Sequence, residues 1–516
     1  MDSKILIVFE ENGHSAMRLF RKAAALAGID LDKIHTHFIC NAAFDNDSWM
    51  EVLASSYTAK AKMLDDLREK IKFAQPNIMV VVGEQALQHL TGLHGIEKWR
   101  GSIIHSKVLD VKTMGVQKGS WIIRGNVQAF WYLVNDLTRA KAQSTFPEIR
   151  TPQWSNIIGP TATEAVEFLD AVPDNEKWSF DIETRANHLA CFSVAYSDRA
   201  MCIPIQNPDG PHFMPPYEAA IYRALDRLMR RNSYLVGQNL TFDLDYMFDY
   251  GLEPRGIWMD TMISHAILYP EFPKGLDFLV SMYTEMPYHK AEGKISNPNI
   301  TTEGLWSYNN KDTITTLWCA NEIEKQLRER KLWPVHEFVT KELSIALEMQ
   351  RIGIQVDPAK KAELSQWIGD EEKELDAMWN PADTMRRLAC QPPRNRPNVN
   401  SPLQVRKFLY QDLGLPTKTR MGSTVSDEQA INELKARNPE LVELDWILRE
   451  RHLRKLQGSY LNAEGEPNGT ISASWCVHGT ETGRWSSGKN RHGRGFNLQT
   501  APKSMRWMFV PYQEAA

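Results

Sequence analysis

The chain has 516 residues, of which 42% are hydrophobic and 24% are charged, with a formal net charge of −4. These values lie close to the average of soluble globular proteins, and the length predicts about three to four domains. The apolar runs have the length of strands, so we expect neither a transmembrane segment nor a signal peptide. Six scattered cysteines without a C-x-x-C pair argue against a disulfide framework or a zinc ribbon, and favour a cytoplasmic protein.

Positive charge is concentrated towards the end of the chain. Residues 451–516 hold nine Lys and Arg against four Asp and Glu, whereas the first 450 residues hold 51 basic against 60 acidic residues. A basic segment on an acidic body predicts an anionic partner at that segment.

The first 145 or so residues alternate between strand and helix patterns. Apolar strands are predicted at Ile5–Phe9 and Ile78–Val82, and helices at Met17–Ala27 and Gln85–Leu93. This alternation indicates an α/β unit. The mostly polar run over residues 141–152, which contains two prolines, predicts a linker.

A second region begins near Trp154 and also mixes strands with helices. Its predicted strands are Lys177–Glu183, Cys191–Ala195, Met201–Ile205 and Tyr234–Gly237, with a helix at Glu218–Arg231. From Val335 onward the pattern is mainly helical. The predicted helices there are Lys341–Met349, Ala359–Trp379, Leu403–Tyr410, Asp427–Ala436 and Leu441–Leu456.

Acidic residues alternate with apolar ones along the strand Lys177–Glu183. Because side chains alternate between the two faces of a strand, Asp181 and Glu183 share one face, opposite an apolar face. Two carboxylates fixed this close repel each other and lose hydration unless a cation lies between them. The alternative is a chance D-x-E triplet on a solvated edge.

Two further pairs of polar residues have helical spacing. Asn239 is placed to cap a helix after a short strand, and Asp243 follows four residues later on the same helix face. Tyr308 and Asp312 are also four residues apart on a predicted helix. Each pair alone has an ordinary structural interpretation, as an N-cap or as a tyrosine that anchors a helix.

The D-x-E, N-x3-D and Y-x3-D groups in this order, with Asp260-Thr261 before the last, resemble the motifs of the DnaQ-like 3′–5′ exonucleases. The proofreading domain of family A (polymerase-I-like) DNA polymerases is the most similar. The resemblance implies that two divalent cations, Mg²⁺ or Mn²⁺, are bound by Asp181, Glu183, Asp243 and Asp312. It also implies that Tyr308 and Glu183 orient the attacking water, that Asn239 contacts DNA, and that nucleoside monophosphates leave a single-stranded 3′ end. Two such cations stabilise charge on both the attacking and the leaving oxygen.

Several later segments resemble the polymerase domain of the same family. Three segments resemble the thumb of that family, namely residues 342–357 (E-L to G-I-Q-V-D), 400–404 (N-S-P-L-Q) and 449–460. Two more segments resemble the part of the family that holds the primer–template DNA, namely T-E-T-G-R-W-S-S at 480–487 and F-N-L-Q at 496–499. This resemblance implies DNA contacts by Lys455, Thr482, Arg484, Asn497 and Gln499, through phosphates and minor-groove acceptors that are nearly independent of sequence. The added basic residues Lys489, Arg491 and Arg494 form either a solvated loop or, as we favour, a phosphate-binding one.

Residues 76–87 and 99–102 resemble the strand and helix of the uracil-DNA-glycosylase superfamily. However, residues 9–13 lack that superfamily's acid-Pro-Gly sequence, and residues 121–126 contain no histidine where H-P-S is expected. We therefore expect a DNA- or partner-binding module, with a purely structural α/β domain as the alternative.

Together these features predict an α/β multidomain protein. Its expected parts are a non-catalytic, glycosylase-like α/β/α domain (1–147), an RNase H-like exonuclease domain with a mixed sheet and flanking helices (148–334), a mainly helical thumb (335–465) and the start of a palm (466–516). The family's catalytic palm and fingers motifs would follow, so we expect a bacterial or bacteriophage polymerase component that needs a second polypeptide for synthesis. A split subunit, an exon product and a truncation all stay open. The alternatives are a freestanding 3′–5′ exonuclease and a non-catalytic DNA-binding accessory protein, and the intact carboxylate set argues against the latter.

Overall fold

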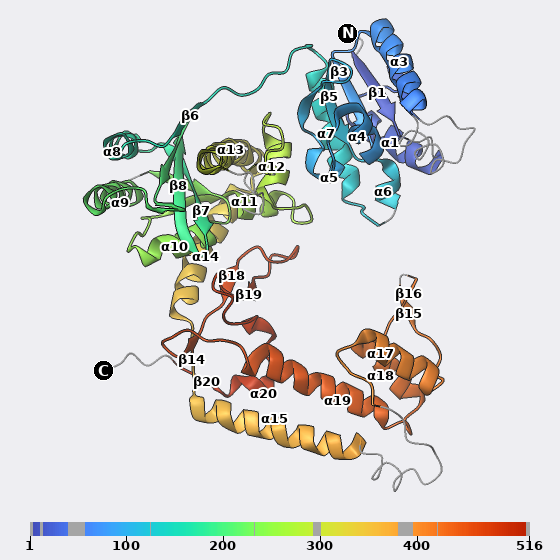
Figure 1. The fold of residues 1–516 in the computed structure, drawn as a ribbon, viewed down its shortest axis with the longest axis vertical. Helices are drawn as coiled ribbons and strands as arrows, with labels where there is room; N and C mark the ends of the chain where they lie inside the picture. The colour runs from blue at the N-terminus through green and yellow to red at the C-terminus, as the bar shows by residue number, and fades with distance from the viewer. Residues whose placement is uncertain are drawn as a thin grey trace. The chain divides into compact units, whose positions relative to one another are not determined.

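The computed structural model describes residues 4–10, 14–39, 57–123, 125–231, 233–290, 292, 301–379, 396–420 and 422–511. The chain divides into two compact units, one comprising residues 1–344 with 480–484, and the other residues 345–479 with 485–516. Figure 1 labels their elements. Among the described residues, no helix combines the length and the apolar character that a bilayer crossing requires.

The first unit begins with a five-stranded sheet in the order β2-β1-β3-β5-β4. Strands β1 (Ile5–Phe9), β2 (His35–Phe38), β3 (Ile78–Val82) and β5 (Val111–Val116) are parallel, and β4 (Ile103–Ser106) is antiparallel to β5. Its helices are α1 (His14–Leu26), α3 (Tyr57–Ala74), α4 (Glu84–Thr91), α5 (Ile96–Trp99), α6 (Gly119–Ile123) and α7 (Ala129–Gln143). The predicted α/β unit is therefore confirmed, although α7 continues into the stretch that was predicted to be a linker.

The side chains of β1 are shared between two cores. Ile5, Ile7 and Phe9 belong to the core that contains residues of α1 and α7, whereas Leu6 and Val8 belong to the core that contains residues of α3 and α4. A parallel strand covered on both faces needs an uninterrupted apolar run. This is why both β1 and β3 have no polar residue.

The second sheet has six strands in the order β13-β12-β7-β8-β9-β6. An antiparallel meander of β7 (Lys177–Arg185), β8 (His188–Tyr196) and β9 (Arg199–Pro204) lies in its middle. Parallel strands extend the meander on both sides, with β6 (Ser155–Ile158) beside β9, and β12 (Tyr234–Gly237) and β13 (Ile257–Asp260) beyond β7. The sheet is therefore mixed, as predicted.

Helices cover both faces of this second sheet. The long helix α13 (Thr302–Glu329) packs on β7, β8 and β9. The helices α8 (Ala162–Asp170) and α9 (Pro215–Arg230) lie on the other side in Figure 1. The remaining elements are a small hairpin of β10 (Gln206–Asn207) and β11 (Gly210–Pro211), and the helices α10 (Leu240–Asp249), α11 (Thr261–Leu268) and α12 (Leu276–Tyr283).

A buried ion pair within the N-terminal domain takes part in the contact of that domain with the second sheet domain of the first unit. The Arg100 guanidinium lies 2.6 Å from Asp136 Oδ1, and the two side chains are 4% and 0% exposed. The same guanidinium donates to Ser281 Oγ of α12 at 2.9 Å. Tyr132 of α7 packs against Phe278 of α12, with ring centroids 5.1 Å apart. These contacts attach the N-terminal domain directly to the helix that precedes α13.

The second unit is mainly helical, as predicted. Helix α14 (Trp333–Ile352) leads into α15 (Pro358–Trp379), α17 (Pro402–Lys407), α18 (Glu428–Arg437) and α19 (Glu443–Leu456), and Leu364 and Leu375 of α15 share a core with Leu453 and Leu456 of α19. Strand β14 (Ile354–Val356) lies between β17 (Thr470–Ile471) and β20 (Phe509–Val510) in an antiparallel sheet. Two small hairpins pair β15 (Thr419–Arg420) with β16 (Ser423–Thr424), and β18 (Ser474–Cys476) with β19 (Ser486–Gly488). The short helices are η1 (Phe408–Asp412), η2 (Gln457–Leu461), η3 (Leu498–Thr500) and α20 (Lys503–Arg506).

Candidate active site

Three carboxylates from distant parts of the chain converge on one face of the second sheet. Asp181 and Glu183 lie on β7, and Asp312 lies on α13, which packs over that strand. One carboxylate oxygen of each residue lies within 4.8 Å of the others. The two-residue repeat of the strand places Asp181 and Glu183 together, and the packing of α13 adds Asp312.

Asp243 lies beside this cluster but is not one of its three members among the described residues. It is buried on α10, and its Oδ1 accepts a hydrogen bond from the backbone N–H of Ile182 at 3.0 Å. Since Ile182 separates Asp181 from Glu183, this bond fixes the Asp243 carboxylate against the strand that carries them.

Asn239 does not cap α10 in the way that the sequence predicted. It occupies the N-cap position with a left-handed φ of 60°, but its side chain accepts no backbone hydrogen bond there. Its Oδ1 instead accepts from Thr241 Oγ1 at 3.2 Å. The helix begins where the sequence predicts, but the side-chain cap is not made, because Asn239 has a left-handed backbone instead of the extended one from which an N-cap side chain reaches the N2 and N3 N–H groups. Two other N–H groups at this helix start have an acceptor from another strand.

That acceptor is Asp260, at the end of β13. Its carboxylate accepts from the backbone N–H groups of Asn239 (3.2 Å) and Leu240 (2.7 Å), at the start of α10. It also accepts from those of Met262 (2.9 Å) and Ile263 (3.3 Å), at the start of α11. One buried carboxylate thus accepts backbone N–H groups that have no acceptor within their own helices, at two helix starts. This gives a structural reason for the aspartate of the Asp260-Thr261 pair in the sequence.

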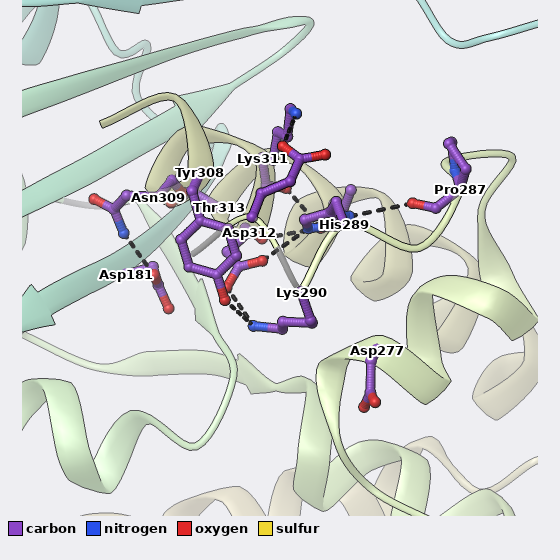
Figure 2. A network of polar contacts seen from close by, with 12 residues as sticks. Asp181, Asp277, Pro287, His289, Lys290, Tyr308, Asn309, Lys311, Asp312 and Thr313 are labelled. Carbon is purple, nitrogen blue, oxygen red and sulfur yellow. Dashed lines mark hydrogen bonds and ion pairs between the residues drawn. The ribbon is translucent and has the colours of Figure 1, made fainter. Parts of the chain in front are cut away.

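Tyr308 and Asp312 point together from α13, and two residues that sequence reasoning missed contact them. Figure 2 shows the Lys290 ammonium between the Tyr308 hydroxyl and the Asp312 carboxylate. Lys290 Nζ donates to Tyr308 Oη at 2.9 Å and forms an ion pair with Asp312 Oδ2, while His289 Nε2 lies 2.8 Å from Asp312 Oδ1. His289 and Lys290 lie outside regular elements, where no periodicity or motif marks them, so the sequence offered only an adjacent His-Lys pair.

Asn309 is another functional candidate that was not singled out in the sequence. Its Nδ2 donates to Asp181 Oδ2 at 2.6 Å, and its Oδ1 accepts from Ser193 Oγ of β8 at 2.6 Å. Ser193 therefore orients the amide. The amide in turn orients the Asp181 carboxylate, as Figure 2 shows.

Burial and mutual repulsion raise the pKa values of most carboxylates at this site. Burial, followed by the charge of Asp312, raises the pKa of Asp181 to about 7. Burial and the charge of Asp181 raise the pKa values of Glu183 and Asp243 well above their ordinary values. Asp312 differs, because Lys290 and His289 outweigh the effect of its burial and lower its pKa. A site of this kind concentrates negative charge and favours cations.

The donor set fits a hard divalent cation. The three clustered side chains offer carboxylate oxygens and no sulfur or imidazole nitrogen. Oxygen ligands of this type are preferred by Mg²⁺ and Mn²⁺.

The candidate DNA contacts of the second half lie on or near the surface. The side chains of Lys455, Thr482, Arg484 and Gln499 are exposed. Asn497 is half-buried, and its Oδ1 accepts from Ser487 Oγ at 3.0 Å and from the Gln499 N–H at 3.1 Å. In the basic insert, Arg494 forms ion pairs with Glu464 (3.3 Å) and Glu466 (3.0 Å), so part of that charge is compensated within the chain.

Comparison with known proteins places the carboxylate cluster inside a recognised domain. Residues 159–328 match the 3′–5′ exonuclease family, and residues 378–515 match DNA polymerase family A. DNA polymerase I of Borreliella burgdorferi is 24% identical over 332 residues, which cover 61% of this chain and 35% of that protein. DNA polymerase I of Synechocystis sp. is 27% identical over 304 residues, which cover 54% and 28%.

A solved structure is also similar in fold. The POL domain of Pol1 from M. smegmatis, in a complex with DNA primer-template and dNTP, gives a TM-score of 0.51 at 17% sequence identity. The similarity covers 68% of this chain and 58% of that one. The chain thus spans about a third of the length of the two curated relatives named above. With its exonuclease and polymerase matches in this order, the chain belongs to DNA polymerase family A and carries a 3′–5′ exonuclease domain.

Proposed function

We propose that the second sheet domain is a two-metal 3′–5′ exonuclease that removes nucleoside monophosphates from DNA 3′ ends and serves proofreading during replication. The observation that carries the proposal is the convergence of Asp181, Glu183 and Asp312 beside Tyr308, inside residues that match the exonuclease family. Oxygen ligands at this spacing are suited to divalent cations that act on a phosphodiester.

Asp181, Glu183, Asp243 and Asp312 are the residues that would hold the two cations. When bound, the cations supply charge stabilisation to the attacking and leaving oxygens of the phosphodiester. Asn309 keeps the Asp181 carboxylate oriented, and the N–H of Ile182 does the same for Asp243.

Tyr308 and Glu183 are assigned the positioning of the attacking water. Burial and the Asp312 charge raise the pKa of the Tyr308 phenol, so it stays protonated and keeps its ability to donate a hydrogen bond. Its hydroxyl is held in place by Lys290. Asn239 is exposed at the start of α10 and is assigned a contact with the DNA strand.

For the second half we propose a thumb over residues 335–465 and a primer–template strip over residues 466–516. Lys455, Thr482, Arg484, Asn497 and Gln499 are the proposed DNA contacts, and the match to DNA polymerase family A supports them. That synthesis requires a second polypeptide stays a prediction. It is tested by primer extension with this chain alone, and extension there would contradict it.

For residues 1–147 we propose a non-catalytic module of the uracil-DNA-glycosylase type that binds DNA or a partner. Support comes from the parallel strands β1, β3 and β5 and from Gly83, which follows β3 with a φ of 105°. A measurement of uracil release from uracil-containing DNA tests the absence of base excision.

The exonuclease proposal is tested by following the shortening of single-stranded DNA labelled at its 5′ end, in the presence of Mg²⁺. We expect a ladder of products that lose one nucleotide at a time from the 3′ end, with mononucleotides as the released species. Chelation of Mg²⁺ and the Glu183→Gln variant should each stop the shortening. Internal cleavage, or shortening that survives both changes, would contradict the proposal.

A further inference from the structure

The Lys290 ammonium places a positive charge at the edge of the carboxylate cluster. Its Nζ donates to Tyr308 Oη at 2.9 Å and pairs with Asp312 Oδ2 (Figure 2). The Lys290 side chain is 27% exposed, whereas that of Asp312 is 4% exposed. The ammonium therefore reaches from the more accessible side onto a carboxylate that is almost fully buried.

Among the residues that the structure describes, no other Lys or Arg forms an ion pair with a carboxylate of the cluster. Its three carboxylates have oxygens within 4.8 Å of one another, and like charges at such a spacing repel strongly. Asp312 is the member whose charge the protein already balances, because the Lys290 ammonium pairs with one of its oxygens, while His289 Nε2 lies 2.8 Å from the other. Asp181 instead receives a neutral amide, from Asn309.

We propose that Lys290 is a built-in counter-cation of the exonuclease site, which competes with a divalent cation for Asp312 and so lowers the affinity of the site for metal. This inference rests on the proposed function. A bound divalent cation either displaces the ammonium from Asp312 or stays close to it and is repelled, and both routes weaken metal binding. The same contact holds Asp312 and Tyr308 in one arrangement before a cation binds.

The proposal is tested by titrating the full chain with Mn²⁺ and measuring the free ion by electron paramagnetic resonance. Lys290→Met removes the charge, and we expect the dissociation constant for Mn²⁺ to fall by about tenfold or more. Lys290→Arg keeps the charge, so its dissociation constant should stay within about threefold of the wild-type value. Lys290→Gln is a second neutral variant, which guards against a packing effect particular to methionine.

Lys311→Met is the matched control. Lys311 is adjacent to Asp312 in sequence, but its ammonium pairs with Glu292. Its removal eliminates the same charge without freeing Asp312, so the dissociation constant should change by no more than about twofold. Urea unfolding of each variant shows whether the fold is intact.

An unchanged or weaker Mn²⁺ affinity in both neutral Lys290 variants would overturn the proposal. An equal gain in the Lys311→Met control would also overturn it, because the effect would then be one of overall charge. Asp181→Ala in the same titration distinguishes a failure of the proposed exonuclease function from a failure of the Lys290 inference. If Asp181→Ala binds Mn²⁺ like the wild type, the proposed function itself fails. If only the Lys290 variants behave unexpectedly, this inference alone fails.

Discussion

The substitution Asp260→Ala should destabilise the exonuclease domain far more than the loss of an ordinary helix cap. Asp260 is 1% exposed, and its carboxylate accepts four backbone N–H groups at the starts of α10 and α11. Alanine removes both carboxylate oxygens, so all four N–H groups lose this acceptor. Because the site is buried, water has little access to replace it.

The expected cost follows from counting helix starts. Loss of one N-cap acceptor costs about 0.5–2 kcal/mol, and Asp260 serves two starts, so about 1–4 kcal/mol is expected, with the upper part of this range favoured because the N–H groups left unpaired are buried. The effect should also reach the active site, because α10 carries Asp243, whose carboxylate accepts from the N–H of Ile182. A loosened α10 should therefore lower exonuclease activity even under conditions where the variant stays folded.

Urea unfolding followed by tryptophan fluorescence measures the free energy of unfolding. Thr161→Ala is the matched control, since Thr161 is an exposed cap in the same domain that serves α8 alone. Its loss should cost about 1 kcal/mol. If Asp260→Ala costs no more than Thr161→Ala, the double-cap interpretation is wrong.

Three further outcomes are expected. Burial lowers the pKa of His265 to about 4. Between pH 6.5 and 4 its imidazole therefore binds a proton in the unfolded chain but not in the folded chain. Stability should then fall by about 3 kcal/mol as the pH falls, and His265→Gln should flatten this dependence in urea titrations at several pH values. Arg100→Met should cost about 3–5 kcal/mol in the same unfolding measurement, because it leaves Asp136 buried without its partner, and Arg100→Met with Asp136→Leu should recover most of it. Arg484→Ala should weaken duplex DNA binding for all sequences alike and reduce the salt dependence by about one phosphate contact, as measured by filter binding over a series of salt concentrations.

Much of the fold could be predicted because its signals are local. The apolar runs Ile5–Phe9 and Ile78–Val82 indicate strands covered on both faces, and the structure places their side chains in two cores. The alternation along β7 likewise places Asp181 and Glu183 on one face, and the four-residue spacing on α13 places Tyr308 beside Asp312. These features depend on neighbouring residues alone.

The unpredicted features depend on contacts between distant segments. Strand β14 pairs with β17 and β20, which lie more than a hundred residues further along the chain, and three-residue strands have almost no pattern of their own. Asn239 was predicted to cap α10 because of its residue type, but its backbone is left-handed, and Asp260, from another strand, accepts other N–H groups at this helix start. Lys290 reaches Asp312 from outside the regular elements, so only the tertiary fold reveals it.

The central claim is that the cluster of Asp181, Glu183 and Asp312 is an exonuclease active site. Its most direct test is the rate of mononucleotide release from single-stranded DNA by Asp181→Ala, measured beside Asp277→Ala. Asp277 is an exposed carboxylate on α12, and it bonds the N–H of its neighbour Phe278. We expect Asp181→Ala to lose more than about 100-fold in rate, since even a partner of a metal ligand contributes about 10–100-fold, and Asp277→Ala to retain wild-type activity. Equal rates for the two variants would contradict the claim.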